Sequence, residues 1–278
     1  MNKAIVDTTI LTDVLLNSGE VRIQAKRALD FFDQTFLPVY AIKEFKSGPL
    51  KNFTWFHNKL ATVGSYKKAL EALHAMSRTP RQYTTSTAIQ ALKEASGSIG
   101  KQCPAILTKK YGENASLDKI WCDELRLALK VAIFRSWKKR RQISTDIIQP
   151  LPCYREVAPY EKRGLIELEP KECIKSGDCT MASLMKTRPD ELRSMREAIV
   201  DSDKPENKRR AKVLRQLYRT PKLPIEDKDC RILGDAVFVF LATKDAVILT
   251  TNISDHVPLA KAVGKRAFSP SQILNKDT

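Results

Sequence analysis

Short apolar runs alternate with helix-spaced segments near the start of the chain. KAIVD at 3–7 predicts a buried strand, and TTILTDVLL predicts a helix capped by Thr8 or Thr9. RIQAKRALDFF has helical spacing, and TFLPVYAIKEF predicts a second strand that leads into a helix carrying Glu44. The tripeptide SGP at 47–49 predicts a break at the end of that helix. Strand, helix, strand, helix is typical of an α/β fold with a central parallel sheet.

The C-terminal part of the chain returns to the same pattern. RILGDAVFVFLATKDAVILTTNISDH, at 231–256, predicts a buried helix, a short apolar strand and a polar loop. KRAFSP at 265–270 predicts a last short strand. Asp235 begins the apolar helix and Asp255 follows the strand, so two carboxylates lie beside the most hydrophobic segment of the chain.

The middle of the chain is mostly helical in pattern. Helical spacing is clear in SYKKALEALHAMS, TSTAIQALKEAS, ASLDKIWCDELRLALKVAIFRSWKKRR, PDELRSMREAI and KPENKRRAKVLRQLYRTPKLP. STDIIQPLPCYREV and RGLIELEP predict short strands or extended pieces. We expect a discontinuous α/β core from residues 1–57 and 225–278 with part of 143–185, and a mainly helical, basic insertion at 58–224. Such an insertion costs little loop entropy.

Composition narrows the class of protein. The 278 residues are 42% hydrophobic and 29% charged, which suits a globular protein, and the net charge of +16 favours polyanionic partners, nucleic acid first. No apolar run approaches the roughly 20 residues of a membrane-spanning helix. Asp7 and Asp13 interrupt the N-terminal apolar run, which argues against a signal peptide. Six cysteines without a C-x-x-C pair and three histidines show no zinc pattern, so we expect reduced thiols in a cytoplasmic protein.

Four acids occupy positions that a sheet-edge site would use. Asp7 and Asp255 follow strands, Glu44 lies in the helix after the second strand, and Asp235 begins the helix before the late strand. Ligands of open parallel sheets bind outside the carboxyl ends of the strands. Clustered carboxylates repel unless cations lie between them, and Mg²⁺ or Mn²⁺ prefers oxygen ligands. Two such ions about 4 Å apart suit phosphodiester hydrolysis. The alternative is that these acids are helix caps and turn residues.

Three segments resemble the conserved blocks of PIN-domain nucleases. AIVDTTILTDVLL resembles the first strand and helix, LPVYAIKEF the second block, and GDAVFVFLATKDAVILTTNISDH the closing blocks. The resemblance covers roughly the first 50 and the last 45 residues. It implies a three-layer α/β/α PIN-like domain in which Asp7, Glu44, Asp235 and Asp255 bind Mg²⁺ or Mn²⁺ and carry catalysis. Thr8 and Asn252 would be supporting polar groups.

The sequence also departs from the family pattern. His256 stands where the family often has an aromatic residue, and Asn252 stands where some members have an acid, which leaves the last carboxylate to Asp255. Asp178, in SGDCTMAS, is either an additional site acid or a plain N-cap. The long middle is not typical of compact members.

Two basic runs lie in the middle of the chain. Arg126 to Arg141 contains seven Lys or Arg and no acid, and Lys204 to Lys222 contains eight against one Glu. These runs predict phosphate contacts, with a solvated face or an acidic protein partner as the alternatives. Trp137 and Tyr218, next to the runs, either stack on bases or belong to the core. The expected nucleic-acid-binding residues are Arg135, Lys138, Lys139, Arg140, Arg141, Lys208, Arg209, Arg210, Lys212, Arg215 and Arg219.

The sequence therefore favours a metal-dependent nuclease, with an endoribonuclease ahead of a DNA nuclease of the same chemistry. The resemblance to PIN proteins admits a toxin or a defence or stress effector, a protein partner that inhibits or activates it, and a homodimer. A non-catalytic module that binds nucleic acid or docks a partner is the second hypothesis. P-loop, dinucleotide-binding and G-x-S-x-G motifs are missing from the sequence.

Overall fold

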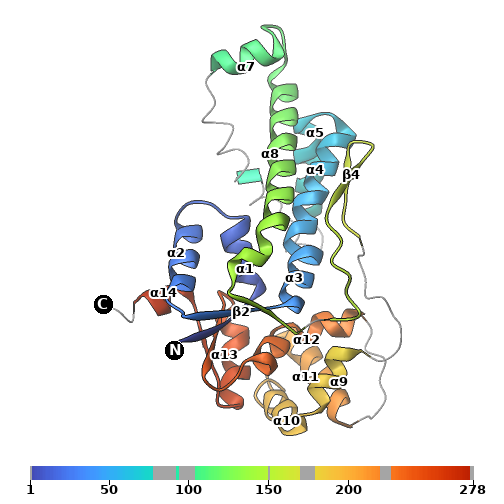
Figure 1. Cartoon of the computed structure of the whole chain (residues 1–278). Coiled ribbons are helices and arrows are strands. Elements are labelled where there is room, and N and C mark those ends of the chain that lie inside the picture. The colour runs from blue at the N-terminus through green and yellow to red at the C-terminus, as the bar shows by residue number, and fades with distance from the viewer. Residues whose placement is uncertain are drawn as a thin grey trace.

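A five-stranded, wholly parallel sheet forms the centre of the computed structural model, which describes residues 2–77, 92–93, 104–149, 151–169, 179–219 and 227–275 (Figure 1). The strand order is β3-β2-β1-β6-β7, and each neighbouring pair is parallel. The strands are β1 (Lys3–Val6), β2 (Gln34–Pro38), β3 (Asp146–Ile148), β6 (Ala246–Leu249) and β7 (Arg266–Phe268). The expected α/β class with a central parallel sheet is confirmed.

The strand order places a topological switch point between β1 and β6. The chain builds outward from β1 through β2 to β3, then returns to the other side of β1 with β6 and continues outward to β7. Val6 pairs with Leu249, so the carboxyl ends of β1 and β6 lie side by side. Open α/β sheets bind ligands at such a crevice.

Helices cover both faces of the sheet. In Figure 1, α1 (Thr8–Leu15) and α2 (Gly19–Asp30) lie above the strands, while α12 (Asp227–Leu241) and α13 (Ile253–Ala262) lie below them. The terminal helix α14 (Pro270–Leu274) packs against α2. All four residues of β6 are buried, as expected for a parallel strand covered on both faces.

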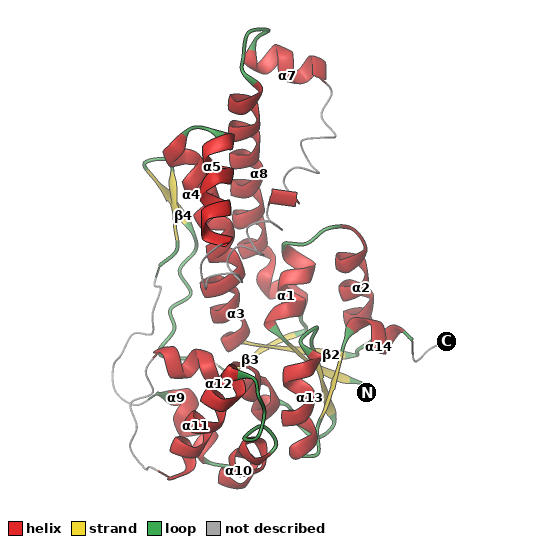
Figure 2. Cartoon of the chain, turned by 180° about the vertical axis from the view of Figure 1, so that it is seen from behind, coloured by secondary structure: helices red, strands yellow, loops and turns green. Residues whose placement is uncertain are grey.

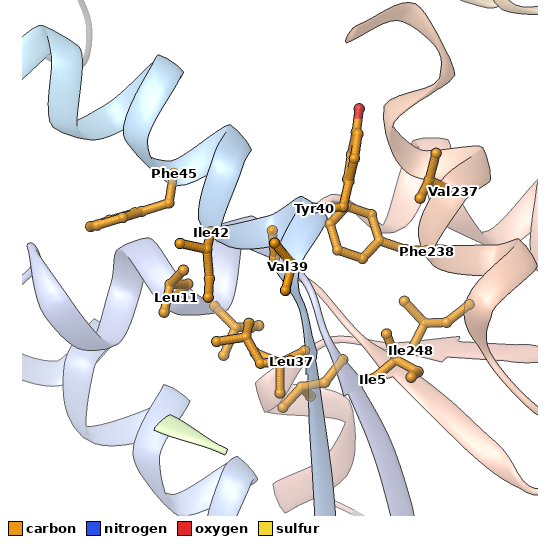
Figure 3. Packing of buried hydrophobic residues seen from close by; sticks show 14 of the residues in the cluster. Ile5, Leu11, Leu37, Val39, Tyr40, Ile42, Phe45, Val237, Phe238 and Ile248 are labelled. Atoms are coloured by element: carbon orange, nitrogen blue, oxygen red, sulfur yellow. The ribbon is translucent and has the colours of Figure 1, made fainter. Parts of the chain in front are cut away.

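The hydrophobic core continues from the sheet into the first helices. Figure 3 shows Ile5, Leu37 and Ile248 of the strands beneath α3 (Val39–Phe45), and Leu11 of α1 beside them. Tyr40 packs edge-on against Phe238, with 5.7 Å between the ring centroids. The sheet edge that carries the acids is thus backed by buried apolar side chains, which hold it in place.

The predicted break at 47–49 is wrong. α3 continues through a π-helical turn at Lys46–Leu50 into α4 (Lys51–Val63). Proline normally interrupts an α-helix because it lacks the N–H donor and its ring clashes with the preceding turn. The π-helical turn changes the local hydrogen-bond spacing and accommodates Pro49 inside the helix.

α4 begins a helical arm that extends away from the sheet (Figures 1 and 2). The arm consists of α4, α5 (Tyr66–Ser77), α7 (Pro104–Tyr111), α8 (Leu117–Lys139) and the hairpin of β4 (Tyr160–Lys162) and β5 (Leu165–Glu167). α8 packs along α4 and returns through a 3₁₀ turn at Arg140–Ile143 to β3. β3, although it follows the arm helices in sequence, therefore belongs to the main sheet.

Three further helices join the core instead of the arm. They are α9 (Thr180–Lys186), α10 (Pro189–Glu197) and α11 (Pro205–Arg219), which lie with α12 and α13 beside the sheet (Figure 2). The stretch 58–224, of which only part of 143–185 was expected in the core, thus has two parts, an arm and a group of helices beside the sheet. The helix expected at 85–96 lies largely outside the described residues. Among the helices in the described part of the chain, none has the length and apolar character that crossing a bilayer requires.

Candidate functional site

Asp7 lies at the switch point and is fixed from both sides of it. It is the N-cap of α1, where Thr8 or Thr9 was expected, because its own carboxylate reaches the first free N–H: Oδ1 accepts from Thr8 N at 2.6 Å. Oδ2 accepts from Thr9 Oγ1 at 2.8 Å and from Thr250 Oγ1, after β6, at 2.6 Å. With only 3% of the residue exposed, Asp7 is a rigid acid at the end of β1.

Glu44 reaches the same edge from α3. Its Oε2 accepts a hydrogen bond from Thr8 Oγ1 at 2.7 Å. Burial and the nearby charge of Asp7 raise its pKa to about 8. No ion pair to Glu44 occurs among the described residues. Asp13 is a second acid near Asp7 whose pKa is raised, to about 6, chiefly by burial, against a hydrogen bond donated by Asn17.

Asp235 follows a kink in α12. This helix begins at Asp227, earlier than the predicted start, and bends at Gly234, whose φ of 20° and ψ of −99° are not helical. A Cβ on Gly234 would lie 3.5 Å from Glu44 Oε1, so the kink carries the α12 backbone close to Glu44. Asp235 Oδ2 accepts a hydrogen bond from the Arg210 guanidinium. Asp235 Oδ1 lies 3.4 Å from Asn252 Nδ2.

His256 lies between the two central carboxylates. Its Nε2 is 3.1 Å from Asp235 Oδ1 and 3.5 Å from Asp7 Oδ2, and the ring is fully buried. Burial alone would lower its pKa, but Asp7 and Asp235 outweigh burial and raise the pKa to about 10. Burial would raise the pKa values of Asp7 and Asp235, but the imidazolium, together with threonine hydroxyls at Asp7 and the charge of Arg210 at Asp235, lowers both. His256 is therefore an internal cation of the site.

Asp255 lies in the first turn of α13, next to Asn252. Its Oδ1 accepts from Lys204 Nζ at 2.7 Å and its Oδ2 from Asn252 Nδ2 at 3.0 Å. Lys204 and Asn252 together outweigh burial and lower its pKa. Asn252 thus links Asp255 to Asp235.

A cavity of about 440 Å³ opens at this edge. Asp7, Glu44 and Asp235 line it together, with Thr8 and Asn252 beside them. Exposed Arg231 also contributes to its wall. The predicted acids are thus brought together, three on one cavity and Asp255 behind them, whereas Asp178 lies outside the described residues.

The acids were expected to need metal ions between them, and the structure supplies protein cations instead. His256, Arg210 and Lys204 neutralise Asp7, Asp235 and Asp255. Within the described ranges, no three His, Cys, Asp or Glu side chains stand arranged to hold a metal ion. The side chains are nevertheless of the oxygen-donor type that a hard cation prefers, because four carboxylates, those of Asp7, Asp13, Glu44 and Asp235, line one cavity, and Glu44 has no cation partner in the described part of the chain.

Sequence reasoning missed these internal cations. Arg210 was expected on a nucleic-acid-binding surface, but it is buried, so that expectation is corrected. Its spacing held the signal: Arg210, Leu214 and Leu217 are separated by four and three residues and share the buried face of α11. His256 carried only the signal of standing next to a predicted acid.

The other basic residues divide between free surface and ion pairs. Lys208, Arg209, Lys212, Arg215 and Arg219 are exposed along α11, and Arg135, Lys138 and Lys139 are exposed near the end of α8. Arg140 and Arg141 both pair with Glu156. Trp137 is a core residue that lies under Lys46 Nζ, at 5.1 Å, and under the Arg140 guanidinium, at 3.8 Å. The buried Trp137 ring is therefore not available to stack on a base.

Comparison with protein-family models, with curated proteins and with solved structures finds no match to this chain. What the site does is therefore inferred from its own contacts and chemistry.

Proposed function

We propose that this chain is a metal-dependent nuclease with a PIN-like core, which hydrolyses phosphodiester bonds, with RNA as the favoured substrate. The observation that carries the proposal is the position of Asp7, Glu44 and Asp235 on one cavity at the β1–β6 switch point. Protein cations neutralise Asp7 and Asp235, so it is the carboxylate of Glu44, without a cation partner in the described part of the chain, that would repel a phosphate backbone unless a bound cation joins it.

Asp7, Glu44 and Asp235 would hold the cation, with Asn252 and Asp255 beside them. A bound Mg²⁺ or Mn²⁺ supplies charge that activates water and stabilises the leaving oxygen. Thr9 and Thr250 fix the carboxylate of Asp7, and Thr8 fixes that of Glu44, so both acids are oriented before any ligand arrives. Arg231 offers the phosphate an exposed guanidinium at the cavity wall.

The basic surface next to the site supports a nucleic-acid substrate. α11 carries five exposed basic residues, and the same helix reaches the site through Arg210. A polyanion bound along α11 would therefore lie near the acids. Contacts of this kind supply affinity without sequence specificity.

One observation favours a second function, a non-catalytic nucleic-acid-binding module. His256, Arg210 and Lys204 satisfy three of the four acids without any metal. A scaffold that has lost catalysis would keep such ion pairs for stability. Glu44 distinguishes the two functions, because a scaffold has no reason to retain a half-buried carboxylate with a raised pKa and no described cation partner.

The test is cleavage of labelled single-stranded RNA and DNA in Mn²⁺, in Mg²⁺ and in EDTA. Asp7→Asn should reduce metal-dependent cleavage by at least about 100-fold, because it weakens the proposed metal site. Asp30→Asn, which removes an exposed carboxylate at the end of α2, is the matched control and should cleave like the parent chain. Equal cleavage by both variants would reject the proposed site, and RNA binding without cleavage in either metal would favour the scaffold.

A further inference from the structure

Arg210 is the most completely engaged cation of the site. It is 6% exposed, and all three of its guanidinium nitrogens have partners. Nε donates to Ile232 O at 2.9 Å, Nη1 donates to Asn207 Oδ1 at 3.0 Å, and Nη2 donates to Asp235 Oδ2. The guanidinium therefore joins α11 to the backbone just before the Gly234 kink and to the acid just after it.

This arrangement places a permanent positive charge against an acid of the cavity. Arginine stays protonated at every accessible pH, so the charge of Arg210 cannot be removed by titration. Lys204, the other basic residue of this segment that pairs with a site acid, has a half-exposed side chain, so solvent screens its charge more strongly. Buried Arg210 is screened less than Lys204 and acts more strongly than Lys204 on any cation that reaches Asp235.

We propose that Arg210 is a built-in counter-ion that allows the acid site to fold without a metal and that weakens the affinity of the site for divalent cations. This inference rests on the proposed function, because it takes Asp235 as a cation ligand. In the metal-free protein Arg210 neutralises Asp235, and a divalent cation has to bind against its charge.

A purely orienting role predicts the opposite effect on metal affinity. If Arg210 mainly aimed Asp235 at the metal, its loss would weaken metal binding by roughly 10–100-fold. Asp235 has other neighbours, however: Oδ1 lies near His256 Nε2 and Asn252 Nδ2, which hold the carboxylate in place without Arg210. We therefore expect the charge to decide, and its removal to tighten metal binding by about tenfold.

The experiment measures Mn²⁺ affinity by electron paramagnetic resonance of the free ion, at one pH and one ionic strength. Arg210→Gln should bind Mn²⁺ about tenfold more tightly than the parent chain, and Arg210→Lys, which keeps the charge, should bind like the parent. Arg209→Gln is the matched control, because it removes the same charge from the exposed face of the same helix. Its Mn²⁺ affinity should not change.

A second variant keeps the proposal testable if Arg210→Gln does not fold. Asn207→Asp leaves Arg210 in place but puts a carboxylate where Arg210 Nη1 now meets an amide oxygen at 3.0 Å. Ser202 Oγ, which now accepts from Asn207 Nδ2, can donate to that carboxylate instead. Asn207→Asp should also bind Mn²⁺ more tightly, because it draws the charge of Arg210 away from Asp235.

The outcomes separate the two proposals. Mn²⁺ binding that is equal in the parent and Arg210→Gln, or weaker in both Arg210→Gln and Arg210→Lys, overturns the counter-ion and leaves the metal site standing. Failure of every form to bind Mn²⁺ overturns the metal site and the counter-ion together. Tighter binding by Arg210→Gln and Asn207→Asp, with Arg209→Gln and Arg210→Lys unchanged, supports both.

Discussion

At the scale of single residues, the site depends on how each acid is held. Asp7 is held by hydroxyl and amide donors, Asp235 by a guanidinium with Asn252 and His256 on its other oxygen, and Glu44 by one threonine hydroxyl. The acids themselves could be predicted, because each lies next to an apolar run whose type is clear from the sequence. Arg210 and His256 could not be assigned as their counter-ions, because that contact depends on how α11, α12 and α13 pack.

Gly234 gives the first prediction at this scale. Its backbone, with φ of 20°, lies where side-chain-bearing residues are rarely found, while a Cβ would meet Glu44 Oε1 at the ordinary distance of 3.5 Å. Gly234→Ala should therefore lower the free energy of unfolding by about 1–3 kcal/mol through backbone strain. Urea unfolding followed by circular dichroism measures the change.

Gly48→Ala is the control for that substitution. Gly48 lines the cavity of the acids, its φ is not positive, and a Cβ there would meet nothing within 4 Å. Gly48→Ala should change the free energy of unfolding by less than about 0.5 kcal/mol. If both alanine variants were equally stable, the kink at Gly234 would not be a strained feature.

At the scale of elements, the sequence identifies helices and strands better than the joints, that is, the connections and contacts between them. The buried run of β6 and the edge strand β7 occur where their patterns predicted them. The joint between α3 and α4 was missed, because Gly48 and Pro49 normally end a helix and the π-helical turn that carries them leaves no mark in a hydrophobic pattern. The strand order likewise depends on contacts between distant segments.

Asn58 joins α4 to the β4–β5 hairpin, which is distant from α4 in the sequence. Its Nδ2 donates to Ile166 O and its Oδ1 accepts from Ile166 N, both at 2.8 Å, so the side chain pairs with β5 as a neighbouring strand would. Asn58→Ala removes two hydrogen bonds worth about 1 kcal/mol each. Amide exchange at Ile166 should become at least about tenfold faster, as measured by NMR.

Thr62→Ala is the matched control on the same helix. Thr62 Oγ1 donates to Asn58 O, on the exposed side of α4, and makes no hydrogen bond to the hairpin within the described structure. Its loss should leave exchange at Ile166 unchanged. Unchanged exchange in Asn58→Ala as well would mean that other contacts hold the hairpin.

At the scale of the whole molecule, the chain topology places the basic helix α11 next to the acids of the sheet edge. The two ends of the chain build the sheet, as their shared pattern predicted, and a helical arm leaves the core through α4 (Figure 1). That α10 and α11 return to the core was not predicted, because their polar sequences resemble those of the arm. Their return places the basic surface of α11 next to the acids, which net charge alone does not specify.

The last prediction tests whether the position of the basic surface of α11 matters for RNA binding. Lys208 and Arg209 form an exposed basic pair on α11, and Lys26 and Arg27 form an equivalent exposed pair on α2. Reversing either pair to glutamate changes the net charge equally, so any difference between the variants reports position. In an Asp7→Asn background, Lys208→Glu/Arg209→Glu should weaken binding of single-stranded RNA by about tenfold or more at moderate salt, because two phosphate contacts are lost.

Fluorescence anisotropy at several salt concentrations measures both the affinity and its salt dependence. The magnitude of the log–log slope should fall by about 1.4 in the α11 variant, since single strands contribute about 0.7 for each neutralised phosphate. The α2 variant should keep the parent slope and lose only the small long-range contribution of net charge, which a Debye length of about 8 Å screens at physiological salt. Equal losses in both variants would mean that the protein attracts RNA by total charge alone, and α11 would then have no special part in guiding a strand to the acids.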